Sequence, residues 1–166
     1  MPTLIKDGAV AEDQWTLIKT ATGPEILQAV PGRNFIVPLQ FWREYQEEIA
    51  AYSGRFALWL DSSEDVNELT DEVHGFPLIA LNFPAFADGR SYSNARELRE
   101  RFDYKGEIRA IGDVLRDQLY LMSRCGFNAF ELRHDQDVDT CLAAFQDFHT
   151  GYQGTVAEPL PLFRRR

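Results

Sequence analysis

The strongest candidates for chemistry lie between two predicted elements, a strand that ends at Phe83 and a helix that begins at Asn94. The ten-residue connection between them exceeds the roughly two to six residues typical of a strand-to-helix loop, and long loops of this kind are often functional. Its polar residues, with one more from the first turn of the helix, are Asp88, Gly89, Arg90, Ser91, Ser93 and Arg96. Backbone N–H groups at a helix start, beside an arginine, bind anions, so the segment predicts an oxyanion site. In the competing interpretation, a serine caps the helix and Asp88-Gly89 forms a turn.

A second charged group surrounds the predicted strand 108–111. Arg109 lies on this otherwise apolar strand, where an unpaired charge is costly, and it joins the candidate anion ligands. The residues that follow at helical spacing and share one helix face are Asp113, Arg116, Asp117 and Tyr120. We interpret Asp113 as a candidate general acid or base whose pKa Arg116 sets, with Asp61 as a further candidate. A structural ion network is the alternative, since such networks also perturb carboxylates.

The motifs of common cofactor enzymes are missing from the sequence. It contains no G-x-G-x-x-G, no phosphate-binding P-loop and no G-x-S-x-G nucleophile motif. A standard NAD or ATP enzyme is therefore poorly supported, and the identity of any cofactor stays open. The three histidines are scattered without metal-ligand spacing. The two cysteines, Cys125 and Cys141, cannot hold a zinc ion or an iron–sulfur cluster alone, and we interpret both as structural thiols.

The charge of the chain argues against nucleic-acid binding. Its 17 basic and 26 acidic residues give a net charge of −9, and its one basic run is Arg164-Arg165-Arg166. No apolar stretch approaches membrane-spanning length, and the N-terminal residues do not resemble a signal peptide. We therefore expect a cytoplasmic protein that contacts neither nucleic acid nor membrane.

Apolar runs and amphipathic segments alternate along the chain. A β-hairpin with an Asp7-Gly8 turn is predicted over residues 3–10, and residues 15–18 are suited to a short strand. Five apolar runs predict strands at residues 35–39, 56–60, 78–83, 108–111 and 129–132. Amphipathic segments predict helices at residues 41–52, 64–73 (with Ser62 and Ser63 as possible caps), 94–102, 114–125 (capped by Asp113) and 138–149 (capped by Asp137).

The five predicted strands begin about 20 to 30 residues apart, which is the length of a strand plus a crossover helix. This spacing predicts an α/β fold: a mostly parallel sheet of about five strands with helices packed on it, preceded by the hairpin. The spacing leaves open whether the sheet is an open three-layer structure or curls toward a partial barrel. Either way, candidate residues far apart in sequence meet at the carboxyl ends of the strands. We expect one α/β domain over residues 1–152 and an extended tail over 153–166, which either docks onto a partner or folds over the acidic body.

Two segments carry a resemblance to a known family. They are LNFPAFADGRSYS (residues 81–93) and GEIRAIGDVLRDQ (residues 106–118), and the N-terminal hairpin and the PLFRRR ending look similar too. The sequence resembles an uncharacterised bacterial family, catalogued as a domain of unknown function and described as oxidoreductases involved in sulfite reduction. That description rests largely on genes that lie beside the sulfite or nitrite reductase haemoprotein.

The resemblance implies a place in assimilatory sulfur metabolism and no particular catalytic residue. It fits a small-oxyanion ligand, and it suggests an oxidoreductase or redox accessory protein acting on such an anion or its carrier. The chain cannot be the reductase itself, because two cysteines cannot hold the cluster that six-electron reduction requires. Two alternatives stay open. One is a non-catalytic assembly or docking partner of the haemoprotein, and the other is a binding module without chemistry.

Overall fold

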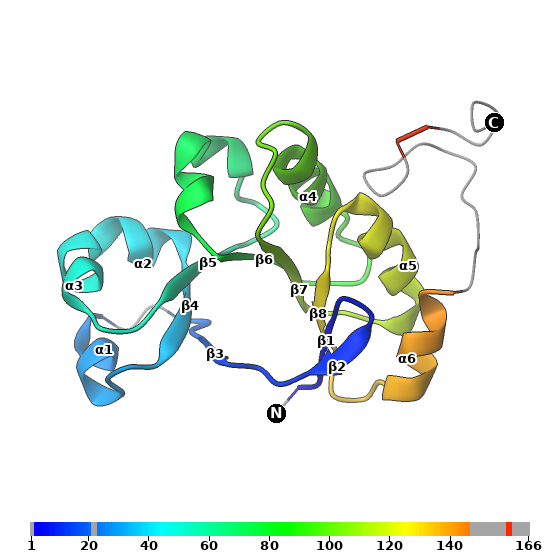
Figure 1. Cartoon of the computed structure of the whole chain (residues 1–166), viewed down its shortest axis with the longest axis horizontal. Helices are drawn as coiled ribbons and strands as arrows, with labels where there is room; N and C mark the ends of the chain where they lie inside the picture. Colours follow the sequence, from blue (N-terminus) through cyan, green and yellow to red (C-terminus); the bar gives the residue numbers. More distant parts are fainter. Residues whose placement is uncertain (1, 21–22, 147–158, 161–166) are drawn as a thin grey trace.

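The computed structural model describes residues 2–20, 23–146 and 159–160 (Figure 1). The strands are β1 (Leu4–Lys6), β2 (Ala9–Ala11), β3 (Trp15–Leu17), β4 (Asn34–Pro38), β5 (Phe56–Leu60), β6 (Leu78–Phe83), β7 (Glu107–Gly112) and β8 (Ala129–Glu131). The α-helices are α1 (Glu25–Ala29), α2 (Leu39–Glu44), α3 (Gln46–Ala51), α4 (Arg90–Glu100), α5 (Arg116–Cys125) and α6 (Val138–Ala144). Two short 3-10 helices, η1 (Val66–Glu68) and η2 (Thr70–Gly75), connect β5 to β6.

All eight strands belong to one mixed sheet with the order β2-β1-β8-β7-β6-β5-β4-β3. Strands β3 to β8 pair in parallel and in the order in which they occur in the chain. The hairpin β1–β2 then adds antiparallel to β8. The carboxyl ends of six strands therefore share one rim, where loops and helix starts converge.

The sheet is curled, because its two edge strands are close neighbours in the chain. In a flat sheet of eight strands the edges β2 and β3 would lie about 34 Å apart, at roughly 4.8 Å per strand. Only residues 12–14 separate the end of β2 from the start of β3, and such a connector spans at most about 14 Å. The edges must therefore approach each other, as the connector at the bottom of Figure 1 shows. Of the two predicted architectures, the partial barrel is the one the chain adopts.

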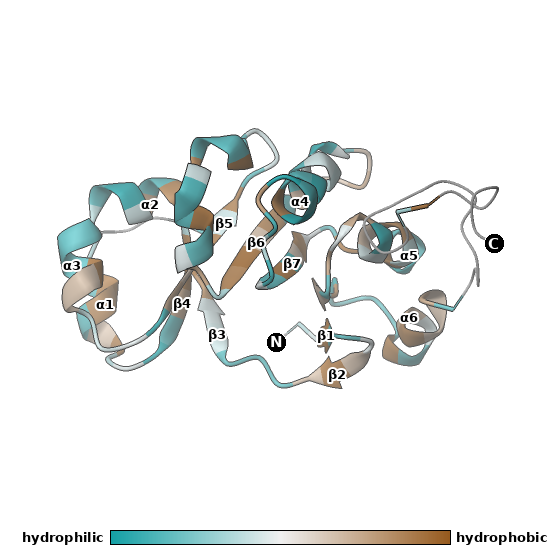
Figure 2. Ribbon diagram, turned by 45° about the horizontal axis from the view of Figure 1, so that its top comes forward, coloured by the Kyte–Doolittle hydropathy of each residue, from teal (hydrophilic) through white to brown (hydrophobic). Residues whose placement is uncertain are grey.

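The helices pack on the outer, convex face of this sheet (Figure 1). Consecutive parallel strands joined by right-handed crossovers place every crossover helix on the same side. The large core lies under the helices and contains alternate strand residues such as Phe35, Leu58 and Phe130. A smaller core on the inner face contains Ile36 and Ile111. In Figure 2 strand β6 is brown along its length and helix α4 is mostly teal, as expected for a buried strand and a surface helix. This arrangement differs from the open three-layer alternative, which would place helices on both faces of the sheet.

The predicted strands agree closely with the observed ones. Strands 56–60 and 78–83 have the predicted limits, and the others differ by one residue at one end or at both. The hairpin is confirmed: Asp7 and Gly8 both have positive φ, at 51° and 81°, as its two-residue turn requires. The sheet has six parallel strands instead of about five, because residues 15–17 form β3.

The helices differ more from prediction. The helix expected over 41–52 is broken at Tyr45 into α2 and α3. The helix expected over 64–73 consists of the 3-10 helices η1 and η2. Asp65, not Ser62 or Ser63, caps η1. Helix α4 begins four residues earlier than predicted, which shortens the preceding connection to residues 84–89. Helix α1 was not predicted.

The caps predicted for the two C-terminal helices are confirmed in part: Leu115, not Asp113, occupies the N-terminal cap position of α5. Helix α5 ends at the left-handed Gly126, as predicted, but it begins two residues later than predicted, at Arg116. Asp137 caps α6 by accepting from the Thr140 N–H. Residues 147–149 of the predicted last helix, and all of the predicted tail except 159–160, lie outside the described residues. Within the described ranges, no helix has the length and apolar character needed to cross a membrane.

Candidate functional site

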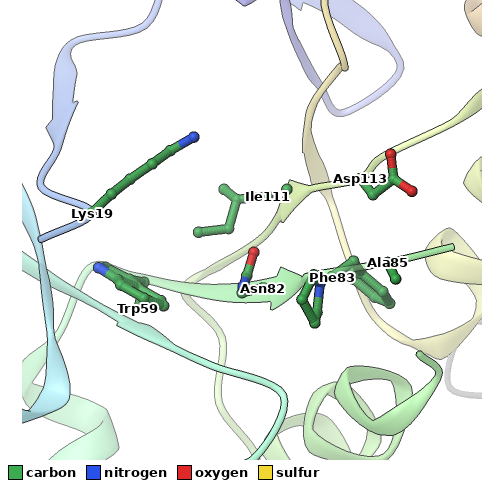
Figure 3. A pocket seen from close by; sticks show the side chains of 9 residues that line it. Lys19, Trp59, Asn82, Phe83, Ala85, Ile111 and Asp113 are labelled. Carbon is green, nitrogen blue, oxygen red and sulfur yellow. The ribbon is translucent and has the colours of Figure 1, made fainter. Parts of the chain in front are cut away.

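A cavity of about 610 Å³ opens at the carboxyl ends of the parallel strands. Its lining comes from the segment after β3, from β5, and from the ends of β6 and β7: Lys19, Trp59, Asn82, Phe83, Pro84, Ala85, Ile111, Gly112 and Asp113. Figure 3 shows the Lys19 side chain extending across the cavity toward the side where Asp113 lies, with Trp59 and Ile111 below it. This is where the parallel topology was expected to bring distant residues together.

Gly112 allows the ends of β6 and β7 to meet closely at this rim. Its φ of +92° lies in the left-handed region. A Cβ on this residue would lie 2.5 Å from both Asn82 Oδ1 and the Phe83 carbonyl oxygen. The next residue, Asp113, donates its backbone N–H to that carbonyl at 2.7 Å. Glycine is therefore required here by backbone conformation and by space.

Lys19 is the cation of the cavity. Within the part of the chain that the structure describes, no carboxylate or other acceptor lies within hydrogen-bond or ion-pair distance of its ammonium group. The segment is held in place by Trp59, whose indole Nε1–H donates to the Ile18 carbonyl at 2.8 Å. Sequence reasoning missed Lys19. The rule that selected other strand ends would have found it, had residues 15–18 been treated as a parallel strand.

Asp61 lies behind the cavity and orients one of its lining residues. Its carboxylate Oδ1 accepts from the Asn82 side-chain amide at 2.8 Å and from the Ser62 N–H at 2.9 Å. The Asp61 N–H in turn donates to Glu64 Oε2 at 2.7 Å. Asp61 thus fixes the Asn82 amide at the end of β6, while Asn82 itself faces the cavity.

The predicted anion site at the start of α4 already holds a carboxylate. The Arg90 guanidinium donates to both oxygens of Asp88, at 3.0 and 2.6 Å, and the Arg90 N–H donates to Asp88 as well. The Ser62 hydroxyl adds a hydrogen bond to Asp88 at 2.7 Å. These bonds, those from Arg90 first, hold the pKa of Asp88 well below its usual range. The anion at this helix start is therefore the Asp88 side chain, and a free oxyanion would have to displace it.

The other residues of that segment have local partners or face solvent. Ser91 is buried and donates to the Asn82 carbonyl at 2.6 Å, which ties α4 to the end of β6. Because α4 begins at Arg90, Ser91 and Ser93 lie inside the helix, and Gly89 occupies the cap position. Arg96 pairs with Glu100 on the exposed face at 3.3 Å. Of the two interpretations, the geometry supports local structure for these residues, and their anion binding stays a prediction.

Asp113 has a different partner from the one predicted. It precedes α5 and is not on the helix face that Arg116 occupies. Its carboxylate accepts from Arg133 Nη1 at 2.6 Å, and Arg133 also donates twice to Asp135, at 2.7 Å each. Hydrogen bonds to these two carboxylates, Asp135 first, raise the pKa of Arg133. Arg116 donates to Asp117, at 3.3 Å. The influence of Arg116 on the pKa of Asp113 stays a prediction.

Arg109 lies inside the barrel and away from the rim. It is 1% exposed, and its guanidinium donates to Glu107 at 2.8 Å and to both oxygens of Asp13 at 3.0 Å. Glu107 also pairs with Lys6 at 2.8 Å. The sequence pattern correctly flagged Arg109 as a buried charge, but its partners make it a structural group that ties the β2–β3 connector to β7.

A second cavity of about 350 Å³ adjoins the first. Its lining residues are Pro2, Lys19, Gly112, Glu131, Leu132, Arg133 and His134, so the two cavities share Lys19 and Gly112. The first cavity is lined largely by aromatic and aliphatic groups and the second largely by polar ones. Together they form one mouth at the carboxyl ends of the strands, which we call the strand-end site.

The described residues provide no metal cluster. Nowhere in residues 2–20, 23–146 and 159–160 do three His, Cys, Asp or Glu side chains converge in a way that would hold a metal ion. Cys125 and Cys141 are free and buried, and burial raises the pKa of both thiols. This agrees with their interpretation as structural residues.

Comparisons with known proteins identify a family but not an activity. No curated protein matches the chain. A family model described as "Bacterial protein of unknown function (DUF934)" matches residues 57–163, which run from β5 through α6 and include most of the strand-end site, though not Lys19. Because this match covers well over half of the sequence, the chain belongs to that bacterial family.

Proposed function

We propose that the protein binds a small oxyanion, or a molecule that carries one, in the strand-end site. We further propose that it does so as an oxidoreductase or redox accessory protein of sulfite reduction. The observation that carries the binding proposal is the Lys19 ammonium, which extends into a cavity of about 610 Å³ and forms no ion pair or hydrogen bond with the described residues. A cation so placed attracts an anionic group.

The size and lining of the cavity favour a carried oxyanion over a free one. A tetrahedral oxyanion fills about as much room as two or three water molecules, roughly 60–90 Å³. A cavity of about 610 Å³ lies in the range of small-molecule sites. Trp59 and Ile111 supply an apolar surface beside Lys19, and the Asn82 amide supplies hydrogen-bonding capacity. We infer a ligand with an anionic group at Lys19 and an apolar or ring-shaped part against Trp59.

Within this proposal the residues around the rim have distinct tasks. Lys19 provides the charge, and Asp61 orients Asn82. Asp113, held by Arg133, presents a carboxylate at the far side of the cavity. The link to sulfite reduction is supported by the resemblance of the segments at residues 81–93 and 106–118, which contain the ends of β6 and β7.

Titration calorimetry with sulfite and with sulfate tests the binding proposal. Lys19→Ala removes the cation and is expected to weaken binding about 10- to 100-fold, the value of one charge-assisted hydrogen bond of about 1.5–3 kcal/mol. Arg90→Ala tests the competing site at the start of α4, and we expect it to bind like the wild type because Arg90 is engaged by Asp88. Arg96→Ala, on the exposed face of α4, is the matched control. Wild-type affinity in Lys19→Ala would contradict the proposal.

A second candidate function is docking onto the sulfite or nitrite reductase haemoprotein. The net charge of −9 favours a partner with a basic surface. A pull-down with purified haemoprotein at low and at high salt tests it. A complex that weakens as salt rises would support docking, and no complex at either salt would contradict it.

A further inference from the structure

Glu131 occupies the junction of the two cavities without a role in the oxyanion site described so far. On β8 its neighbour Phe130 points into the outer core, so Glu131 points to the inner face. It lies one position beyond the Ala110–Phe130 register pair, which sets it beside Ile111 of the first cavity. Glu131 itself lines the second cavity with Lys19. The carboxyl group is therefore close to the place where the anion is proposed to bind.

The Glu131 carboxyl is half-buried and has no hydrogen-bond or ion-pair partner among the residues that the structure describes. Burial raises its pKa above the usual value, and the charges of Arg109, Asp13 and Lys19 act on it in order of decreasing size. Arg109 and Lys19 lower its pKa, whereas Asp13 raises it. Arg109 is already neutralised by Glu107 and Asp13. Of these two cations, Lys19 is therefore the one whose charge a bound anion can neutralise.

The surroundings of Glu131 contain other charged and titratable groups. They are Lys6 of β1, Asp13 of the β2–β3 connector, Lys19 beyond β3, Glu107 and Arg109 of β7, and Asp113, Arg133 and His134 at the rim. Arg133 is paired with Asp113 and Asp135, and Lys6 is paired with Glu107. His134 also lines the second cavity beside Glu131.

We propose that Glu131 takes up one proton from solvent when an anion binds beside Lys19. The proposal rests on the proposed oxyanion site. An anion at Lys19 cancels the charge that favours the Glu131 carboxylate and adds a negative charge next to it, and both effects favour the protonated form. The carboxylate oxygen gains the proton, and no other bond changes. The neutral carboxyl group can then donate a hydrogen bond to the bound anion. The ligand class is thus an oxyanion that accepts a hydrogen bond from a carboxylic acid.

Sulfate is the probe, because its charge does not change between about pH 5 and 8. We expect its affinity for the wild-type protein to fall as pH rises through the titration of Glu131, by up to about tenfold per pH unit for one linked proton. Calorimetry in two buffers of different ionisation enthalpy should show a net uptake of a fraction of a proton, up to one. In Glu131→Gln, which keeps the shape and a hydrogen-bond donor, the affinity should be independent of pH and the uptake should vanish.

The control variant His134→Gln replaces the imidazole that lines the second cavity beside Glu131. This variant should still take up a proton when sulfate binds. If His134→Gln loses the uptake and Glu131→Gln retains it, Glu131 is not the group that takes up the proton. Lys19→Ala separates the two proposals. Suppose that Lys19→Ala weakens sulfate binding but Glu131→Gln still takes up the same proton as the wild type. This result would contradict the Glu131 proposal and leave the oxyanion site standing. Sulfate binding that is unaffected by Lys19→Ala, or absent from the wild type, overturns both.

A second measurement on the wild-type protein does not depend on the folding of any variant. Carbon-13 NMR of glutamate carboxyl groups, with Glu131 assigned, follows its titration with and without sulfate. The proposal requires the Glu131 midpoint to move to higher pH when sulfate is added. An unchanged midpoint under saturating sulfate would overturn it.

Discussion

Replacing Asp13 by asparagine removes one of the two carboxylates that neutralise the buried Arg109. Asp13 lies in the three-residue connector between the two edge strands, and its carboxylate meets the Arg109 guanidinium with two contacts of 3.0 Å. The Arg109 side chain is 2% exposed and that of Asp13 is 18% exposed. Asparagine keeps the oxygen that accepts the Trp15 N–H at 3.0 Å. It replaces the other oxygen, which also accepts from Arg109 Nη1, by an N–H₂ donor, so the substitution removes the charge and one acceptor of the ion pair.

The burial of this ion pair determines the expected loss of stability. Exposed pairs contribute about 0–1 kcal/mol, whereas breaking a buried pair costs about 3–5 kcal/mol. Glu107 still neutralises Arg109 at 2.8 Å after the substitution, which places the expected cost between these values. We expect Asp13→Asn to lower the free energy of unfolding by about 2–3 kcal/mol. For a chain of this size that corresponds to a decrease in Tm of about 4–12 °C.

Urea unfolding followed by circular dichroism measures this cost, and a double-mutant cycle assigns it. With a slope of about 2 kcal/mol/M, the midpoint should fall by about 1 M or slightly more. In an Arg109→Met background, the same Asp13→Asn change should cost less than about 0.5 kcal/mol, because the cation is gone. Glu12→Gln, an exposed neighbour in the connector, should change stability by no more than about 0.5 kcal/mol. Equal costs of Asp13→Asn in both backgrounds would refute the claim that this pair ties the connector to β7.

Three further outcomes follow from the geometry. Gly112→Ala should lower the free energy of unfolding by at least about 2 kcal/mol in urea titrations, because Gly112 has a positive φ and no room for a Cβ. Gly75→Ala is the control: nothing lies within 4 Å of the added Cβ, so its effect on stability should be close to zero. Asp88→Asn should lower Tm at pH 7. Because hydrogen bonds from Arg90 hold the pKa of Asp88 below its unfolded value, its contribution is complete above about pH 5 and is lost as pH falls below about 4. The variant should therefore lose less Tm than the wild type between pH 6 and pH 3, and an equal loss would contradict this role. The two buried cysteine thiols should resist iodoacetamide at pH 8 in the native protein and react fully in urea, as mass spectrometry can show.

Local sequence patterns were sufficient to predict the strands of this protein. Buried parallel strands are nearly continuous apolar runs, and residues 56–60 and 78–83 were predicted with their observed limits for that reason. The Asp7-Gly8 turn was equally local, because both residues adopt the positive φ that the turn demands. Helix limits were predicted less well. The first turn of α4 contains Arg90, Ser91 and Tyr92, and polar residues of this kind are typical of a loop. Ser91 is nevertheless buried against β6.

The sequence alone thus determined the fold class and the position of most strands. It did not determine which side chains would be free there. Arg90 was a credible anion ligand by type and spacing, but its charge is taken by Asp88, and Arg109 is taken by Asp13, 96 residues away. The sheet curls until β3 lies across the barrel from β8 (Figure 1). This curvature brings Lys19, which follows β3, into the strand-end site. Local runs of apolar residues indicate which segments are buried, so the sequence predicts the strands. The pairing of charges depends on which distant segments meet in space, and only the tertiary structure decides which segments meet.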